Sequence, residues 1–439
     1  MRREVSFASL LFLIALPLMT PSTEAAMLVE TMSEPFGAFR GVDFVRYTGR
    51  FVGATPKGDY RMAFEIVAPL HPDLGNGTVL VEPPHFAFGT SGRDGILGRA
   101  FLFHRGFSYA SVGFGINGLN VLDPTATDLV LAGVPVQQPD PNPVTDQEIL
   151  IQFVNALKTD SFATAVLGII ERTYGFGVSQ TADVGWQVVF HRPGGQNLLD
   201  FTLLFESLWR PPFITPAHSE QLPEQWAPTS GIGKIIFVET EADQLISGAE
   251  QFRRAVVGPE ADLGSYRLYE VAGAPHFAQP PPLNPLTANA VARAVFVAGD
   301  RWVRSGITPP PSVLLAEAPP GAIDPVYGFE SGIARDDDLN AVGGVRFPDV
   351  ELGRAFFVAS LLDVEIVPGL PGLVGGWTDL QCEPLPDGSP RFANHGQYVS
   401  GVSRQANMLR RHGFLLASDA EELKARAAES AVGRPGSCD

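Results

Sequence analysis

Apolar runs of strand length alternate with helical segments through the middle of this 439-residue chain. This alternation predicts an α/β fold with a mostly parallel sheet, because helices on the crossover connections cover both faces of such a sheet. Polar residues alternate with apolar ones in the last strand candidate, which indicates a strand with one solvent-facing side. The strand candidates are residues 78–81, 107–112, 234–238 and 266–271, and the helical candidates are residues 149–157, 163–170 and 288–304.

The segments on either side of this pattern differ from it. Apolar and polar residues alternate over residues 36–69, which predicts antiparallel strands leading into the sheet. From about residue 309 the chain is rich in Pro and Gly, and helical spacing returns only at residues 397–411 and 420–428. We therefore expect a C-terminal extension that packs on the main domain.

The first residues have the pattern of an export signal. Arg2 and Arg3 provide a positive start, residues 7–19 form a short apolar run, and small residues at 23–26 offer a cleavage site. A membrane anchor is the alternative, but the run is shorter than the ~20 residues that a span needs. Export permits a disulfide, and the sequence leaves open whether Cys382 and Cys438 are bridged or are unpaired thiols.

The composition restricts the partners of the chain. A hydrophobic content of 45% with 18% charged residues is ordinary for a globular protein with a large buried core. The formal net charge of −17 argues against a nucleic-acid partner and against docking on an anionic membrane. No stable membrane span is expected after removal of the signal, since the later segments are interrupted by Pro, Gly or charge.

A serine stands in a turn between small residues, in the segment Gly177-Val178-Ser179-Gln180-Thr181. A serine hydroxyl becomes a useful nucleophile when a tight turn exposes it and a base lies within hydrogen-bond reach. Gly177 permits the close backbone approach of such a turn, and Thr181 stands where a small residue lets strand and helix pack. Because this pattern is common in a chain with 46 Gly, the nucleophile hypothesis depends on finding partners for Ser179.

The partners follow in the order that serine hydrolysis needs, which is nucleophile, acid and histidine on successive strand ends. The segment 239–243 contains three carboxylates directly after a predicted strand. We choose Asp243 as the acid because it lies deepest in that loop, and Glu241 is the alternative. His276 follows the next strand in a turn of small residues, where its ring is free to enter a cleft.

The oxyanion of an acyl-transfer intermediate needs two hydrogen-bond donors. The backbone N–H of Gln180, the residue after the nucleophile, is placed by the turn itself. A second donor is expected from the loop that follows the strand at residues 78–81. Pro83 and Pro84 have no N–H, so His85 or Phe86 must supply it.

Taken together, these segments resemble the α/β-hydrolase superfamily, and more closely its α/β-hydrolase-domain family with a Gly-x-Ser-Gln-Ser/Thr nucleophile turn. This sequence departs from the family in having Ala182-Asp183 after Thr181, where Gly is usual. The resemblance covers nearly the whole mature chain and implies esterase-like acyl transfer to water. The matching segments are residues 76–82, 105–107, 177–181, 239–243, 272–276, 305–310 and 343–350.

Other candidate sites are weaker. Ser91 lies in a serine motif, but no strand directly precedes it. The acidic segment 336–340 lacks the Gly and the distal Glu of a calcium loop, so a solvated turn is favoured. Asn76 fits a glycosylation acceptor and also a turn. We expect no cofactor and no metal, since no histidine-rich spacing and no phosphate-binding Gly-rich loop occurs.

The sequence therefore predicts an exported, periplasmic or extracellular, serine hydrolase that acts on a small-molecule carboxylic ester. The expected division is a signal peptide at residues 1–25, an α/β-hydrolase catalytic domain at 26–308 and the extension at 309–439. A non-catalytic binding protein on the same scaffold is one alternative. An amidase or acyltransferase with the same triad is another. The oligomeric state and the ester groups recognised stay open, because loops such as 119–144 and 205–226 would form the pocket walls.

Overall fold

The computed structural model describes residues 26–55, 58–84, 92–113, 144–179, 181, 182, 185, 188, 197–207, 233–246, 265–367 and 370–438. The predicted signal peptide at residues 1–25 lies outside these ranges. The main strands are β1 (Met27–Phe39), β2 (Val42–Thr55), β3 (Gly58–Pro69), β4 (Thr78–Val81), β5 (Ser108–Val112), β6 (Arg172–Val178), β7 (Phe201–Phe205), β8 (Lys234–Thr240) and β9 (Tyr266–Val271). The helices are α1 (Arg99–Phe103), α3 (Val144–Thr159), α4 (Ser161–Leu167), α7 (Glu241–Ile246), α9 (Asn289–Ser305), α10 (Pro348–Glu351), α11 (His395–Arg411) and α12 (Ala417–Glu429).

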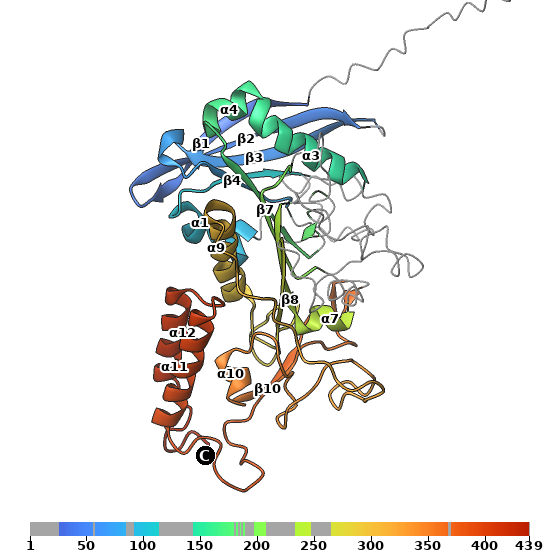
Figure 1. Cartoon of the computed structure of the whole chain (residues 1–439), viewed down its shortest axis with the longest axis vertical. Coiled ribbons are helices and arrows are strands. Elements are labelled where there is room, and N and C mark those ends of the chain that lie inside the picture. Colours follow the sequence, from blue (N-terminus) through green and yellow to red (C-terminus); the bar gives the residue numbers. More distant parts are fainter. Residues whose placement is uncertain are drawn as a thin grey trace, which may run out of the picture.

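These strands form a nine-stranded sheet in the order β1-β2-β3-β5-β4-β6-β7-β8-β9. The first three strands pair antiparallel with one another, and β3 pairs antiparallel with β5. From β5 to β9 every neighbouring pair is parallel. Figure 1 shows β1, β2 and β3 at one end of the molecule and the C-terminal helices at the other. The predicted mostly parallel sheet with an antiparallel entry is confirmed.

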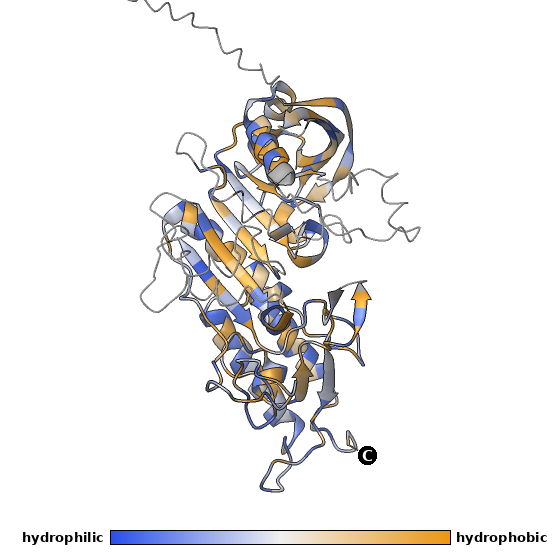
Figure 2. Cartoon of the chain, turned by 90° about the vertical axis from the view of Figure 1, so that its right-hand side faces the viewer, coloured by the Kyte–Doolittle hydropathy of each residue, from blue (hydrophilic) through white to orange (hydrophobic). Residues whose placement is uncertain are grey.

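Helices cover both faces of the parallel strands, as the alternation predicts. On one face, Leu204, Phe237 and Leu268 pack in a core with the α3 side chains of Phe153 and Leu157. On the other face, Leu203, Ile236 and Tyr269 pack with the α9 side chains of Val295 and Phe296. Figure 2 shows the hydrophobic residues concentrated in the central strands of the sheet. Successive residues of a strand point to opposite faces, so continuous apolar runs are what a sheet buried on both sides requires.

The prediction that β9 has one solvent-facing side is wrong, because all six of its residues are buried. Its two charged residues, Arg267 and Glu270, lie on opposite faces of the strand, and residues of the extension contact both of them. The carboxylate of Glu270 accepts a hydrogen bond from the backbone N–H of Leu315 at 2.6 Å. Arg267 donates to the carbonyl of Pro310 at 3.1 Å, and its guanidinium lies 5.3 Å from the ring centre of Trp302. Both charged side chains are therefore paired inside the protein.

The segment after α9 forms the extension and continues the sheet at its β9 edge through single bridges. Val313 pairs with Tyr269 and Val345 pairs with Val271. Beyond these bridges, α11 and α12 pack side by side (Figure 1). The short strands are β10 (Ala355–Val358), β11 (Glu365–Val367), β12 (Leu370–Pro371) and β13 (Gly376–Asp379). The placement of the domain boundary at residue 308 stays a prediction.

Cys382 and Cys438 are joined by a disulfide that closes a loop of the extension, with a sequence separation of 56. The structure thus selects the bridged form of the two that the sequence leaves open. Among the described helices, none is long and apolar enough to cross a membrane.

Candidate active site

Ser179 follows directly after β6, at the carboxyl end of the parallel strands. It has a φ of +53°, in the left-handed region that a non-glycine residue adopts only where the surrounding structure imposes it. Its N–H donates to the carbonyl of Phe205 on the neighbouring strand at 2.9 Å, and its carbonyl accepts from the N–H of Ala182 at 3.0 Å. The chain therefore makes a tight, strained turn at this serine, as a nucleophile turn requires.

Two small residues make this turn possible. A Cβ on Gly177 would stand 2.6 Å from the carbonyl oxygen of Thr181 and 2.7 Å from the Cα of Ala182, so only glycine fits there. The hydroxyl of Thr181 donates to the carbonyl of Val178 and accepts from the N–H of the same residue, each at 2.9 Å. Thr181 is fully buried, and its side chain closes the turn from inside.

His276 links the turn to the predicted acid. Its Nδ1 lies 2.7 Å from Oδ1 of Asp243, and its Nε2 lies 3.2 Å from Oγ of Ser179. The three side chains come from the ends of β6, β8 and β9, and all three residues are at most 3% exposed. The structure therefore brings together the three residues that the sequence analysis selected, in one hydrogen-bonded line. Such a line can move a proton from the serine hydroxyl to the imidazole.

The second oxygen of Asp243 fixes the orientation of its carboxylate. Oδ2 accepts hydrogen bonds from both the N–H and the hydroxyl of Thr240, each at 2.8 Å. Oδ1 is thereby left facing His276 and accepts its Nδ1–H. This holds the imidazole in the tautomer whose Nε2 lone pair points at Ser179, which is the tautomer that a base needs.

Glu241, the alternative acid, has other partners. One oxygen accepts the backbone N–H of Gly273 at 2.8 Å, and the other lies 2.5 Å from the guanidinium of Arg335. Both interactions are buried. The carboxylate is therefore used to join α7 to the histidine loop and to the extension, and it is Asp243 that reaches the imidazole.

Another carboxyl near the site was not found from the sequence. Glu206 follows directly after β7, between the strand ends that carry Ser179 and Asp243, and has a φ of +52°. Burial raises the pKa of the Glu206 carboxyl well above its usual range, and the negative charges of Asp243 and Glu239 add to this shift. The site thus holds a second buried carboxyl, beside Asp243, whose charged form is disfavoured.

The proposed oxyanion donors Gln180, His85 and Phe86 lie outside the described residues. Glu82, the first residue of the loop that contains His85 and Phe86, is described, and the sequence analysis did not select it. The buried carboxylate of Glu82 accepts from the N–H of Gly92 at 2.6 Å, the N–H of Arg93 at 3.1 Å and the hydroxyl of Tyr109 at 2.9 Å. Glu82 therefore ties together the two ends of the segment that contains His85 and Phe86.

Glu82 is also expected to make stability depend on pH. Burial raises the pKa of its carboxyl to about 7 against the opposing effect of its three donors, whereas the unfolded chain has an ordinary pKa of 4.5. Between these values the folded state binds the proton more tightly, so the contribution of Glu82 to stability is fully present below pH 4.5 and is lost as the pH rises from 4.5 through 7. A shift of this size corresponds to about 3 kcal/mol.

The Glu82→Gln variant isolates this contribution. We expect the free energy of unfolding of the wild type, relative to that of the variant, to decrease by about 3 kcal/mol between pH 4.5 and 8. Denaturant titrations of both proteins across this range measure the difference, in which all other titrating groups cancel. Parallel stability curves would contradict the assignment.

The weaker candidates have structural partners where they are described. Asp338 binds the guanidinium of Arg391 through both of its oxygens, and Asp336 accepts from Arg346 and from two backbone N–H groups. Asn76 caps a turn by donating to Arg105 and accepting from Thr78. Within the described part of the chain, no group of three or more His, Cys, Asp or Glu residues could hold a metal ion. Ser91 lies outside that part.

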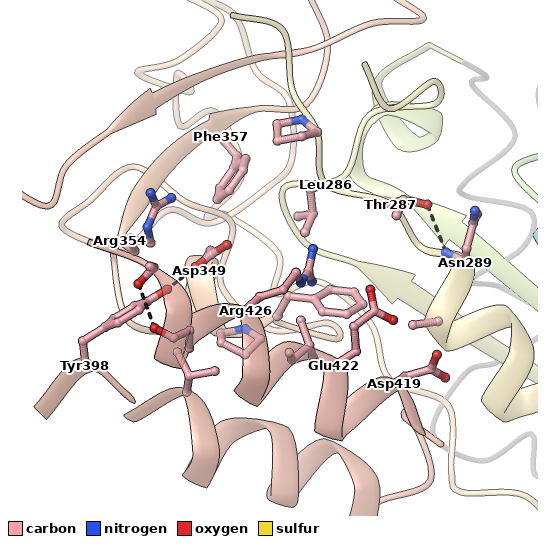
Figure 3. A pocket seen from close by; sticks show the side chains of 18 of the residues that line it. Leu286, Thr287, Asn289, Asp349, Arg354, Phe357, Tyr398, Asp419, Glu422 and Arg426 are labelled. Atoms are coloured by element: carbon pink, nitrogen blue, oxygen red, sulfur yellow. Dashed lines mark hydrogen bonds between the residues drawn. The ribbon is translucent and has the colours of Figure 1, made fainter. Parts of the chain in front are cut away.

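A separate cavity of about 360 Å³ lies between the start of α9, α10, α11 and α12 (Figure 3). Apolar side chains such as Phe347 and Phe357 line it, together with Arg354, Asp419 and Arg426. None of the residues Ser179, Asp243 and His276 lines this cavity. It is therefore distinct from the site that the hydrogen-bonded line marks.

Comparison with known proteins gives one extended match. The family model described as "Alpha/beta hydrolase domain" matches residues 48–425, which include Ser179, Asp243, His276 and most of the extension. No curated protein matches the chain.

Solved structures of hydrolases are similar to parts of the chain. A putative dienelactone hydrolase from Klebsiella pneumoniae subsp. pneumoniae MGH 78578 is 12% identical, with a TM-score of 0.31, and the match covers 55% of this chain and 85% of that one. Esterase Est22 is 14% identical, with a TM-score of 0.33, over 52% of this chain and 72% of that one. Esterase 2 of Thermogutta terrifontis is 12% identical, with a TM-score of 0.29, over 57% of this chain and 84% of that one.

Proposed function

Because the chain belongs to the alpha/beta hydrolase domain family, we propose that it is an exported serine hydrolase that cleaves carboxylic esters through an acyl-enzyme intermediate. The observation that carries this proposal is the buried line from Asp243 through His276 to Ser179, with distances of 2.7 and 3.2 Å. A purely structural serine does not need a strained turn and an aligned histidine–carboxylate pair.

In the proposed reaction, His276 Nε2 takes the proton from Ser179 Oγ as that oxygen attacks the ester carbonyl. Asp243 stabilises the imidazolium that forms. Collapse of the tetrahedral intermediate breaks the ester C–O bond, and His276 Nε2 gives its proton to the leaving alkoxide. Water then attacks the acyl group with His276 again as base, the bond between the acyl carbon and Ser179 Oγ breaks, and His276 Nε2 returns the proton to Oγ. The products are a carboxylic acid, an alcohol and the free enzyme.

The developing oxyanion needs hydrogen-bond donors that bind it more strongly than they bind the carbonyl oxygen of the substrate. We assign this role to the backbone N–H of Gln180 and to an N–H of His85 or Phe86. The hydrogen bonds of Glu82 to Gly92 and Arg93 support the second part, because they hold the base of that loop beside β4.

Export is part of the proposal. The pattern of the first residues supports it, and the disulfide between Cys382 and Cys438 is compatible with an oxidising compartment. The substrate is a small-molecule ester.

A fluorophosphonate probe tests the central claim, since it reacts with serines that a base activates. We expect one adduct per folded molecule, located at Ser179 by peptide mass spectrometry, and none in the Ser179→Ala variant or after unfolding. A chain-length series of p-nitrophenyl esters beside matched anilides then separates esterase from amidase activity. If folded protein remains unlabelled at Ser179, the chain is not a serine hydrolase, and a binding role on this scaffold takes its place.

A further inference from the structure

The extension reaches the candidate site through Arg335. Its guanidinium lies 2.5 Å from Oε1 of Glu241 and binds Oδ2 of Asp324 through two nitrogens, at 2.8 and 3.0 Å. The side chains of all three residues are at most 4% exposed. The ring of Tyr327 lies on the guanidinium, 5.3 Å from its centre. Arg335 is thus held by Glu241, Asp324 and Tyr327, and it contacts the first residue of the helix that carries Asp243.

Glu241 connects two elements that each carry a member of the triad. It is the first residue of α7, the helix that contains Asp243, and its Oε2 accepts the N–H of Gly273 in the loop that leads to His276. The N–H of Ala242 also donates to the carbonyl of Ala274 at 3.2 Å. The distance between Asp243 and His276 therefore depends on how α7 is seated against this loop.

Other contacts of the extension hold the same loop. The N–H of Phe277, next to His276, donates to the carbonyl of Leu373 at 2.7 Å. A Cβ on Gly273 would lie 3.1 Å from side-chain atoms of Val350 and Phe357, so the extension packs closely against the loop backbone. The two elements that Glu241 links, α7 and the loop that leads to His276, thus both contact residues after position 309.

We propose that Arg335 is a positioning residue for the triad, which acts through Glu241 to fix α7 against the histidine loop. This inference rests on the proposed function. It makes the extension a required part of the active site, because the cation that neutralises the buried Glu241 carboxylate comes from the extension. Without that cation, Glu241 loses the partner that holds its carboxylate at Gly273, and its negative charge acts on the imidazole nearby.

The ionisable groups around this link define the expected pH response. Arg335, Asp324 and Tyr327 approach from the extension, Glu239 and Asp243 from β8 and α7, His276 from the loop after β9, and Glu206 from the end of β7. In the wild type, Arg335 lies between the carboxylates of Glu241 and Asp324 and offsets one of the two negative charges. Its removal adds one uncompensated negative charge near His276, which favours the protonated imidazole and moves the acid limb of the pH–rate profile to higher pH.

The test compares Arg335→Met with Arg391→Met in the full chain. Arg391 is the matched control, since its side chain is 6% exposed and binds Asp338 through two nitrogens within the extension. Active sites are titrated with the fluorophosphonate, so that kcat is expressed per competent Ser179 and unfolded protein does not count. For Arg335→Met we expect kcat per site to fall by about 10- to 100-fold, KM to change by less than about threefold, and the acid limb to rise by about one pH unit.

A double variant covers the case in which Arg335→Met fails to fold. Arg335→Met/Glu241→Gln removes the uncompensated charge and keeps an acceptor for Gly273, so the acid limb is expected to return to the wild-type position while kcat per site stays about tenfold low. Wild-type kcat per site in either variant, or a loss and a pH profile equal to those of Arg391→Met, overturns the proposal. If the wild type itself takes no label, the proposed function fails instead.

Discussion

Replacing Ser179 by alanine is expected to lower kcat for a p-nitrophenyl ester by about 10⁶-fold, with KM changed by less than about threefold. In the proposed reaction, the hydroxyl 3.2 Å from His276 Nε2 forms the covalent bond, and no other hydroxyl contacts the imidazole in the described residues. Residual turnover would come from water attacking a bound ester in the presence of the oxyanion donors alone.

Steady-state kinetics of the purified variant measure this loss, and a control isolates the role of the hydroxyl. Ser360 is a suitable control, since it is 1% exposed and donates to the carbonyl of Gly372 within the extension. The Ser360→Ala variant loses a buried hydroxyl of the same kind, and we expect its kcat to stay within about threefold of the wild type. A Ser179→Ala enzyme with more than a few per cent of wild-type kcat would assign the nucleophile to another residue.

The order of elements could be predicted from the sequence because each is encoded locally. A run such as residues 235–238 is apolar at every position, so it needs cover on both faces, and α3 and α9 provide that cover. The residues Ser179, Asp243 and His276 were selected by the same reasoning, since each stands shortly after the end of a strand. Parallel strands bring such positions to one edge of the sheet.

What the sequence could not provide are contacts between distant segments. The alternation in β9 misled the prediction because Arg267 and Glu270 look solvated until Pro310 and Leu315 are placed beside them. Separations of 43 and 45 residues carry no periodic signal. The same reason applies to Glu82, whose donors Gly92 and Arg93 become visible only when the intervening loop is folded back.

The choice between two acids was limited in the same way. Glu241 and Asp243 are two residues apart on one helix, and residues at that spacing do not share a face. Within α7, therefore, only one of them can reach His276, and the sequence, from which we expected a loop here, does not show which. The answer depends on Arg335, which lies 94 residues further along the chain and takes Glu241 as its partner.

Replacing Asp243 by asparagine is expected to lower kcat by about 10⁴-fold. The N–H and hydroxyl of Thr240 both donate to one oxygen of Asp243, so the asparagine must turn its carbonyl oxygen toward Thr240. Its NH₂ group then faces Nδ1 of His276 and can only donate. The imidazole must carry its proton on Nε2, where it points at Ser179 and cannot accept the hydroxyl proton.

Two further carboxyl-to-amide changes serve as controls for Asp243→Asn. Glu241→Gln keeps an acceptor for Gly273 but weakens the link to Arg335, so a loss of about tenfold is expected. In Glu206→Gln a carboxyl whose neutral form is already favoured becomes an amide, and we expect the smallest change, within about threefold. Measuring kcat and KM of the three variants on one ester ranks the acids by their effect on the imidazole. A loss in Glu241→Gln that equals or exceeds the loss in Asp243→Asn would move the role of triad acid to Glu241.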